Sequence, residues 1–281
     1  MVTVSENITR PTPPPTTREP DFTAITMGST ELRLARGIGD IEAAQELRYR
    51  VFYEEMGAEP SHESAGLGLD RDSFDAAAEH LLVIDHARGG EVVGTYRLLR
   101  RRFSEKSGGF YTSREFDISK LTRAKGEILE LGRSCVAREF RSRATMSLLW
   151  RGLAAYAFEH KIELMFGCAS FPGADPAVYA EALSYLHQNH LAPRDLRPSA
   201  LPARYVDMNV SGAREIETKR AIASLPPLIK GYMRLGGWVG DGAVIDHQFN
   251  TTDVCIIVKM ENLTRRYSRH YERTARGVGL Q

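Results

Sequence analysis

A strand, a basic loop and a helix follow one another directly between residues 127 and 157. Residues 127–136 (EILELGRSCV) form a run rich in apolar residues that is typical of a strand. Beyond an arginine-rich loop, apolar residues recur at helical spacing and predict an amphipathic helix; they are Met146, Leu149, Trp150, Leu153 and Ala157. A chain that passes from a strand into a long amphipathic helix is restricted to folds that pack helices on a sheet.

The other segments continue this alternation. Residues 80–85 and 91–99 are two β-rich runs separated by Gly89 and Gly90, which predicts a hairpin. Further elements are predicted as a strand from about Glu31, a helix from an N-cap at Asp40 to Met56, a strand at 163–168, a helix at 175–190 and a strand at 253–259. We therefore predict a mixed α/β layer fold with a central sheet flanked by helices.

The first 28 residues differ in composition from the rest of the chain. Five prolines lie between Pro11 and Pro20 among threonines, a composition that does not bury apolar surface. We predict a disordered Pro/Thr-rich tail at 1–28 and a single domain at 29–281, within which we find no repeat and no break.

The charges are balanced in total but segregated along the sequence. Lys and Arg number 37 and Asp and Glu 36, for a formal net charge of +1. Residues 54–85 are strongly acidic, whereas 97–106, 133–143 and 265–276 are basic. This segregation indicates one cationic and one anionic ligand, unless the clusters are solvated faces that cancel across the fold. We find no basic stripe with interleaved aromatic residues, so we predict no nucleic-acid partner.

The sequence also bears on where the protein works. No apolar run approaches the ~18 residues that span a bilayer. The first residues lack the basic start and apolar stretch of a secretory signal. Three scattered cysteines, Cys135, Cys168 and Cys255, do not make a disulfide framework. We expect a cytoplasmic protein.

The start of the helix after the arginine-rich loop is suited to binding an anion. Backbone N–H groups in the first turn of a helix have no partner within it, and the helix dipole is positive there. Arg141 and Arg143 stand at this point and add guanidinium groups that match a phosphate. The alternative is a solvated arginine loop.

Two other motifs give weaker indications of a functional site. His187 and His190 have a spacing that metals use on helices, but no matching ligands accompany them, so we predict surface histidines and no metal site. Cys168 is either a nucleophile or, as is usual for a thiol among apolar neighbours, a packed and inert side chain.

Several stretches of the sequence resemble motifs of a known enzyme superfamily. The loop Arg138-x-x-Arg141-x-Arg143 lies where GNAT acyltransferases carry Q/R-x-x-G-x-G/A, with both glycines replaced by arginine, which argues against ordinary use of acetyl-CoA. The stretches LRYRVFYEE (47–55), DSFD (72–75), VGTYRLL (93–99) and ELGR (130–133) resemble the branch of that superfamily that takes acyl groups from acyl carrier protein, including acyl-homoserine-lactone synthases.

Within that branch, the chain resembles the bacterial ornithine N-acyltransferases over about residues 30 to 271. The stretches that carry this resemblance are 49–58, 131–136, 148–156, 166–176 and, most specifically, 225–254. It implies a GNAT-like sheet with a C-terminal extension. The implied reaction transfers a 3-hydroxyacyl group from the phosphopantetheine of acyl carrier protein to the α-amine of L-ornithine, giving lyso-ornithine lipid. It requires no bound metal or redox cofactor.

The resemblance also suggests roles for single residues. Glu130 and Arg133 are the expected catalytic residues, with Glu130 as the general base through a water. The alternative for Glu130 is a structural ion pair with Arg133 or Arg48. N–H groups near Cys135 and Val136 would polarise the thioester carbonyl. The expected binding residues are Arg141 and Arg143 for the phosphopantetheine phosphate, Arg97, Arg100, Arg101 and Arg102 for the acidic carrier protein, and Asp72, Asp75, Asp241 and Asp246 for substrate ammonium groups. The glycine-rich segment WVGDG (238–242), around Asp241, is predicted to be a turn.

Some alternatives stay open at this point. Asp72 and Asp75 would equally suit a structural acidic loop. Residues 265–276 form either an interfacial helix that touches the inner membrane surface or a solvated one. The competing functions are acylation of a different amine, autoinducer synthesis, and a non-catalytic module that binds acyl carrier protein or lipid.

Overall fold

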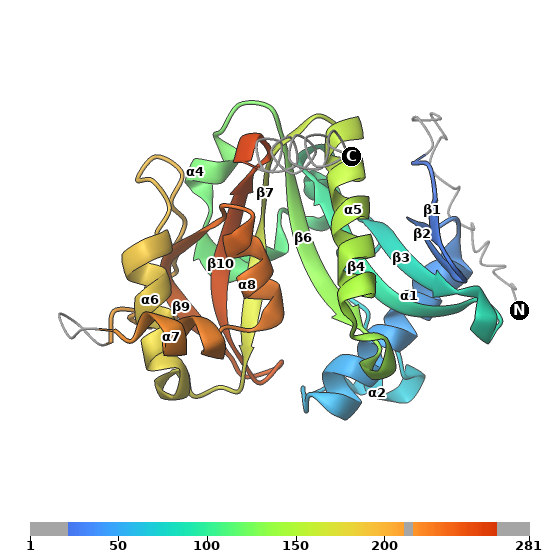
Figure 1. Ribbon diagram of the computed structural model, residues 1–281, viewed down its shortest axis with the longest axis horizontal. Helices are drawn as coiled ribbons and strands as arrows, with labels where there is room; N and C mark the ends of the chain where they lie inside the picture. The colour runs from blue at the N-terminus through green and yellow to red at the C-terminus, as the bar shows by residue number, and fades with distance from the viewer. Residues whose placement is uncertain (1–21, 211–215, 263–281) are drawn as a thin grey trace, which may run out of the picture.

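A mixed sheet forms the centre of the computed structural model, which describes residues 22–210 and 216–262 (Figure 1). The sheet order is β1-β2-β3-β4-β6-β7-β10-β9-β8-β5. The strands are β1 Ile25–Met27, β2 Thr30–Leu34, β3 Glu79–Asp85, β4 Glu91–Arg100, β5 Phe116–Asp117, β6 Glu127–Val136, β7 Ile162–Pro172, β8 Ser199–Ala200, β9 Trp238–Asp246 and β10 Thr251–Lys259. The pairs β6–β7 and β8–β9 are parallel, and the other neighbours are antiparallel.

Helices cover both faces of this sheet, with α5 and α8 on the face toward the viewer in Figure 1 and α1 behind. The helices are α1 Ile38–Tyr49, which continues as the π-helical segment Arg50–Glu55, α2 His62–Leu67, α3 Arg101–Ser104, α4 Ser119–Thr122, α5 Arg143–Glu159, α6 Ala180–His190, α7 Thr218–Ser224 and α8 Pro227–Arg234. Short 3₁₀ turns lie at His86–Arg88, Glu105–Ser107, Tyr111–Arg114 (η4), Arg138–Phe140 and Pro176–Tyr179. The predicted mixed α/β layer fold, with a central sheet flanked by helices, is confirmed.

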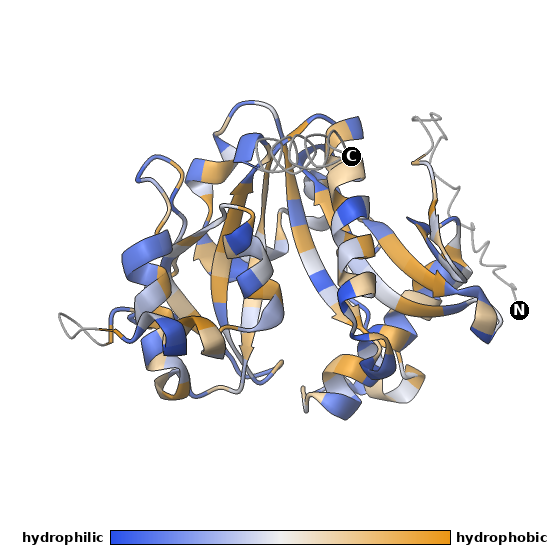
Figure 2. Ribbon diagram, viewed as in Figure 1, coloured by the Kyte–Doolittle hydropathy of each residue, from blue (hydrophilic) through white to orange (hydrophobic). Residues whose placement is uncertain are grey.

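Neighbouring residues of β7 show how one strand serves two cores. Met165 packs with Tyr232 of α8, whereas Phe166 points the other way and meets the Phe110 ring at a centroid distance of 5.0 Å. Alternate strand residues face opposite sides of a sheet, so a strand covered on both sides is apolar throughout. Much of the length of the central strands is accordingly hydrophobic in Figure 2.

β6 and β7 separate part of the way along their length. Their parallel pairing runs from Glu127 opposite Ile162 to Glu130 opposite Phe166 and includes no later residue. β6 bulges where Arg133 and Ser134 stand opposite one residue of β4. Since bulges bend the strand that carries them, this one directs β6 away from β7. We call the place where the strands part the fork.

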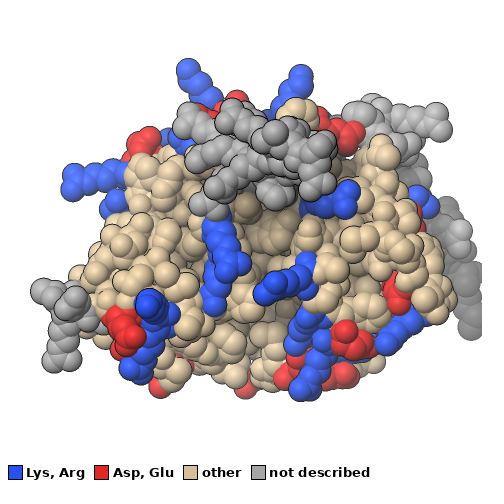
Figure 3. All heavy atoms as spheres, viewed as in Figure 1, with Lys and Arg blue, Asp and Glu red and all other residues tan. Residues whose placement is uncertain are grey.

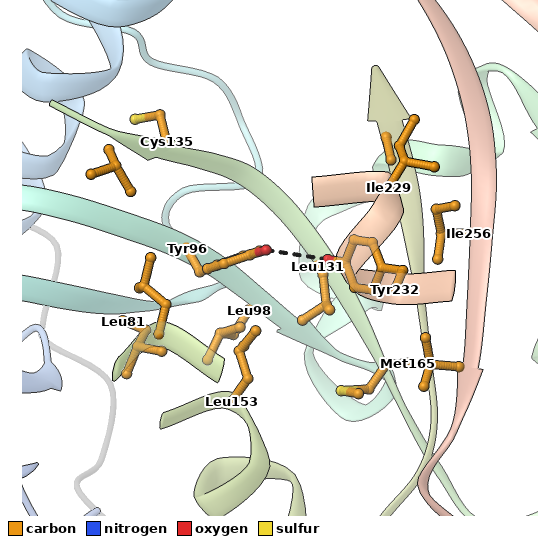
Figure 4. Close-up of a cluster of buried hydrophobic side chains, with 14 of the residues drawn as sticks. Leu81, Tyr96, Leu98, Leu131, Cys135, Leu153, Met165, Ile229, Tyr232 and Ile256 are labelled. Carbon is orange, nitrogen blue, oxygen red and sulfur yellow. Dashed lines mark hydrogen bonds between the residues drawn. The ribbon is translucent and has the colours of Figure 1, made fainter. Parts of the chain in front are cut away.

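The side chain of Tyr232 from α8 reaches into the fork. Its hydroxyl is 3.3 Å from that of Tyr96 on β4, and both side chains are buried. Figure 4 shows this hydrogen bond, together with Leu131 and Met165 from the two separating strands. Aromatic side chains therefore fill the space that a continuous sheet would close with backbone hydrogen bonds.

Most predicted elements are confirmed, including the hairpin through Gly89 and Gly90, whose φ angles of 73° and 88° suit glycine. The helix predicted from an N-cap at Asp40 begins two residues earlier, and Asp40 instead accepts hydrogen bonds from Arg33. The predicted tail boundary at residue 29 is wrong, because β1 pairs with β2 around a turn at Gly28.

The glycine-rich segment WVGDG, interpreted from its composition as a turn, is part of β9. Val254 pairs with Ala243 and Ile256 with Val239, so three residues of β9 lie opposite Cys255 alone. Gly242 adopts a φ of +80° within this bulge. Glycines mark bulges and turns alike, because both require positive φ.

Two predictions concern segments beyond the described residues. Residues 1–21, most of the predicted tail, and the basic segment 265–276 both lie outside them. Over 22–210 and 216–262, no helix has the length and apolar character needed to cross a bilayer.

The close approach at the fork predicts a sharp effect at Gly167. A Cβ atom there would lie 2.1 Å from the Leu131 carbonyl oxygen, which is backbone and cannot move aside cheaply. Gly167→Ala should lower the free energy of unfolding by about 2 kcal/mol or more, measured by urea denaturation. Gly66→Ala on α2, where a Cβ meets nothing within 4 Å, serves as control and should be neutral or slightly stabilising. An equal effect of both substitutions would contradict this account of the fork.

Candidate active site

Aspartates and arginines alternate in a buried network beside the fork. Three arginines come from α1, β4 and β6, and three aspartates come from the loop between α2 and β3. The members of this aspartate–arginine network are Arg48, Arg97, Arg133, Asp70, Asp72 and Asp75. Three carboxylates face three guanidinium groups, so the network is neutral as a whole.

Arg48 lies at its centre and is 0% exposed. Its Nε donates to Asp70 Oδ2 at 2.7 Å, and its two terminal nitrogens donate to the Asp75 oxygens at 3.0 and 2.9 Å. Gln45 and Tyr53 donate to the same two carboxylates at 2.9 Å. Despite burial, the arginines hold the pKa values of Asp70 and Asp75 below the ordinary aspartate range.

Arg133 connects this network to the fork. Its φ of +49° places it in the left-handed region, at the bulge of β6. Its Nε donates to Asp70 and its Nη2 to Asp72, both at 3.1 Å. The guanidinium also lies 4.8 Å from the Tyr111 ring centroid and 4.5 Å from that of Phe249. Arg133 is thus held by partners from three separate segments.

Glu130 is the last paired residue of β6 before the fork and is 4% exposed. Its carboxylate accepts hydrogen bonds from the backbone N–H groups of Tyr111 at 3.0 Å and Thr112 at 2.7 Å. Burial raises its pKa, while these donors and Arg97 oppose the rise. Glu130 does not form the alternative ion pair with Arg133 or Arg48. Its carboxylate is instead held by backbone N–H groups of η4.

A small pocket of about 10 Å³ lies at the fork. Leu131, Met165 and Tyr232 line it, together with Phe166 and Cys168 of β7. Phe166 pairs with Glu130 across the two strands, so the pocket lies close to Glu130 along the chain.

One backbone N–H group on the separating part of β6 is directed toward the fork. Ala137 N donates to Val93 O of β4, whereas Val136 O accepts from Arg141 at 3.0 Å. Because the polar groups of consecutive strand residues point in alternate directions, the Val136 N–H faces away from β4. Of the two predicted carbonyl-polarising groups, Val136 is suitably directed, and Cys135 belongs to the β4 side.

The arginines at the start of α5 differ in how they are held. Ser142 caps the helix by accepting a hydrogen bond from Thr145 N. Arg141 is bound to both carboxylate oxygens of Glu55, one at 2.8 Å. Arg143 is exposed and forms no ion pair with another of the described residues. The structure therefore leaves Arg143 accessible to an anion, whereas Arg141 would first have to release Glu55.

The four arginines predicted to meet a carrier protein do not form one surface. Arg97 belongs to the aspartate–arginine network, and Arg100 is bound to Glu79 at 2.9 Å; each is 3% exposed. The prediction is wrong for these two, because β4 is central and covered on both faces. Arg101 is half-buried against the Ala124 carbonyl, and Arg102 is exposed.

The aspartates predicted to bind ammonium groups are also separated. Asp75 is buried with Arg48 and Arg97, so the alternative of a structural acidic loop describes it. Asp72 is bound to Arg97 and Arg133 but remains partly exposed. Asp241 accepts from the Tyr205 hydroxyl at 3.1 Å, and buried Asp246 accepts from Phe249 N.

A second group of carboxylates near Glu130 is not among the residues predicted from the sequence. Glu115, Cys168 and Asp253 place one donor atom each within 4.8 Å of the others. Among the described residues, no such group contains His187 or His190. Burial and the neighbouring carboxylates raise the pKa of the Cys168 thiol well above its ordinary value, which disfavours a nucleophilic role. Asp253, a charged residue within the apolar run DVCIIVK, was the available signal.

The aspartate–arginine network predicts a large cost for removing its central arginine. Arg48→Met should lower the free energy of unfolding at pH 7 by about 3–5 kcal/mol, because Asp70 and Asp75 lose a buried partner. Arg50→Met, which removes a half-exposed pair with Glu91, is the matched control and should change it by less than about 1 kcal/mol.

The loss in free energy of unfolding caused by Arg48→Met should depend on pH. Since the pKa values of both aspartates are lowered on folding from 3.8, their contribution is present above about pH 4 and is lost as the pH falls further. The difference in free energy of unfolding between Arg48→Met and the parent protein, measured by urea denaturation, should therefore become smaller in acid. A difference in free energy of unfolding below about 1 kcal/mol at pH 7 would show that the network does not stabilise the fold.

Known proteins resemble this chain over most of its length. The acetyltransferase (GNAT) domain family matches residues 47–151. An L-ornithine N(alpha)-acyltransferase from Brucella abortus (strain 2308) is 50% identical over 251 residues, covering 87% of this chain and 89% of the relative. A protein of the same name from Rhizobium meliloti (strain 1021) is 48% identical over 251 residues, covering 87% and 85%. Among solved structures, the AHL synthase LasI is 12% identical, covers 82% of this chain and 90% of its own, and has a TM-score of 0.44.

The similarity to these relatives extends over most of the chain and over nearly the whole of each relative. The chain belongs to the family of L-ornithine N(alpha)-acyltransferases.

Proposed function

We propose that this protein transfers a 3-hydroxyacyl group from acyl carrier protein to the α-amine of L-ornithine, giving lyso-ornithine lipid. The observation that carries the proposal is 50% identity, over 87% of the chain, to an enzyme named for acylation of ornithine. The position of Glu130 supports it, because a buried carboxylate with a raised pKa stands at the place where β6 and β7 part.

The chemistry is aminolysis of a thioester. The α-amine attacks the thioester carbon through a tetrahedral oxyanion, a C–N bond forms, and the C–S bond breaks as the phosphopantetheine thiolate leaves. Glu130 takes the proton that the amine loses, through a water molecule, and this proton is finally returned to the thiolate. The Val136 N–H, further along the same strand β6, stabilises the oxyanion.

Arg133 acts as a positioning residue in this scheme. Its guanidinium ties Asp70 and Asp72 to the Tyr111 ring, and Tyr111 N is one of the two donors that hold Glu130. Arg133 thereby fixes the turn on which the orientation of the base depends. It does this without a direct hydrogen bond to Glu130.

The donor approaches from the side of α5 and α8. Lys and Arg side chains flank a hollow in this face of the molecule (Figure 3). Arg143 and the start of α5 bind the phosphate of phosphopantetheine, and Arg141 joins when Glu55 is displaced. Arg102, with the half-buried Arg101, meets the acidic carrier protein. The group that carries the acyl chain belongs to that partner, and the enzyme needs no cofactor of its own.

The acylated product is amphipathic, which places its release at a membrane surface. The basic segment 265–276, outside the described residues, supplies the charge for a peripheral contact with anionic lipid.

The direct test combines purified protein, 3-hydroxyacyl carrier protein and a panel of amino acids, with mass spectrometry of the products. We expect N-α-acylornithine. Product with another amine but none with ornithine would overturn the substrate, and no product with any amine would favour a binding module.

In this assay, Glu130→Gln should lower kcat by roughly 10²–10⁴-fold, because glutamine keeps the shape of the side chain but accepts no proton. Glu127→Gln, on the same strand and the opposite face, is the control and should retain activity. A loss below about tenfold for Glu130→Gln in a folded protein would assign the base elsewhere.

Substitution of Arg143 tests how the donor binds. Arg143→Ala should raise the KM for acyl carrier protein by roughly tenfold or more with kcat little changed, because a charge-assisted hydrogen bond to phosphate contributes about 1.5–3 kcal/mol. Arg151→Ala, exposed two turns later on α5, is the matched control. Equal effects of the two substitutions would indicate general attraction of the carrier protein and no phosphate site at the start of the helix.

A further inference from the structure

Two buried carboxylates near the fork have no role in the reaction as described so far. Glu115 follows η4 and Asp253 lies on β10; they are 2% and 4% exposed. One carboxylate oxygen of each lies within 4.8 Å of the other and of Cys168 Sγ. Cys168 Sγ is 3.3 Å from Glu115 Oε2. We call these three side chains the Glu115–Cys168–Asp253 cluster.

The negative charge of this cluster is poorly compensated. Asp253 Oδ1 is buried without a hydrogen-bond partner, although the hydroxyls of Ser170 and Thr251 lie near enough to oppose part of the rise in pKa. Glu115 Oε1 lies 3.8 Å from Arg204, whose side chain is one-third exposed. An unpaired polar atom in a protein interior is costly, which points to a cationic group that completes the cluster when bound.

The pKa values agree with this geometry. Burial and repulsion by Asp253 raise the pKa of Glu115 to about 7, and burial and repulsion by Asp246 raise that of Asp253 to about 6. Asp246 adds to both shifts, while Arg204 lowers both, and Cys168 donates to Glu115. A bound cation would reverse this balance and favour the ionised carboxylates.

The cluster adjoins the proposed base through a short series of contacts. Thr112 N donates to Glu130 at 2.7 Å, and Thr112 Oγ1 is 3.8 Å from Cys168 Sγ. Cys168 also lines the pocket at the fork. A molecule whose reacting amine lies beside Glu130 therefore has the cluster within the reach of a short side chain.

We propose that Glu115 and Asp253 bind the δ-ammonium of ornithine and so select a diamino acid. The proposal rests on the proposed function and specifies how that site recognises its acceptor. An ammonium group offers three donors, and the cluster offers two carboxylates with the thiol sulfur beside them. Asp246, which acts electrostatically on both carboxylates, adds negative charge.

The same geometry explains rejection of amino acids with neutral side chains. An aliphatic side chain in this position would leave two buried carboxylates without a cation, at a cost that the ornithine complex avoids. A divalent metal ion is the competing occupant. The ammonium is favoured because the cluster has no histidine and its thiol resists ionisation.

The test compares ornithine with norvaline, which has the same carbon chain and no δ-amine. We expect the parent enzyme to prefer ornithine by at least about 10²-fold in kcat/KM. Glu115→Gln and Asp253→Asn should each reduce this preference at least tenfold, by lowering kcat/KM for ornithine and leaving that for norvaline within about threefold. Asp117→Asn, on the exposed side of the same segment, is the control and should keep the preference.

Thermal unfolding with each amino acid supplies a readout that needs no turnover. Ornithine, and not norvaline, should raise the Tm of the parent protein, and this difference should be lost in both variants. The substitutions are close in shape and remove repulsion between buried charges, so the unliganded variants should fold. Metal content of the purified protein is measured alongside.

The possible failures are separable. If the parent enzyme acylates no ornithine, the proposed function fails, and the inference fails with it. If it acylates ornithine but the variants keep the preference, or lose activity equally on both amino acids, the inference alone is overturned. A stoichiometric metal that is lost in both variants would assign the cluster to a metal ion.

Discussion

The burial of Arg48 is the constraint on which the rest of the structure depends. A guanidinium with no solvent contact needs carboxylates on all its donor edges, and the loop between α2 and β3 supplies Asp70 and Asp75. Those carboxylates in turn require Arg97 and Arg133. Four segments distant in sequence are thereby fixed to one another by hydrogen bonds with directional geometry, which apolar contacts alone do not provide.

The fork follows from this arrangement. Arg133 reaches the aspartates from a bulge with a positive φ, and the bulge turns β6 away from β7 immediately after Glu130. Gly167 permits the closest approach of the two strands before they part. The position of Glu130, the pocket at the fork and the direction of the Val136 N–H group therefore follow from one local distortion of β6. Strain at a functional position is here stabilised by buried ion pairs.

The sequence predicted those features that depend on local pattern. The strand–loop–helix unit from β6 to α5 was recognised because apolar periodicity is a property of neighbouring residues. The bulge of β9 was taken for a turn, since glycine serves both. Arg97 and Arg100 were taken for surface residues because nothing in the sequence shows that β4 is covered on both faces. The sequence does not identify Glu115 as a candidate site residue, because its neighbours Arg114 and Asp117 are exposed and only the fold shows that Glu115 is buried.

The segregated charges are a further case in which the sequence does not show what surrounds a residue after folding. The acidic segment 54–85 was interpreted as a site for a cation, yet its central aspartates are paired with arginines from three other elements. The carboxylates that lack a full partner, Glu115 and Asp253, come from segments without a marked excess of acidic residues. Net charge along a sequence counts ionisable groups, whereas binding depends on which of them remain uncompensated after folding. A site for a cation is therefore indicated more strongly by one buried oxygen without a partner than by a run of acidic residues.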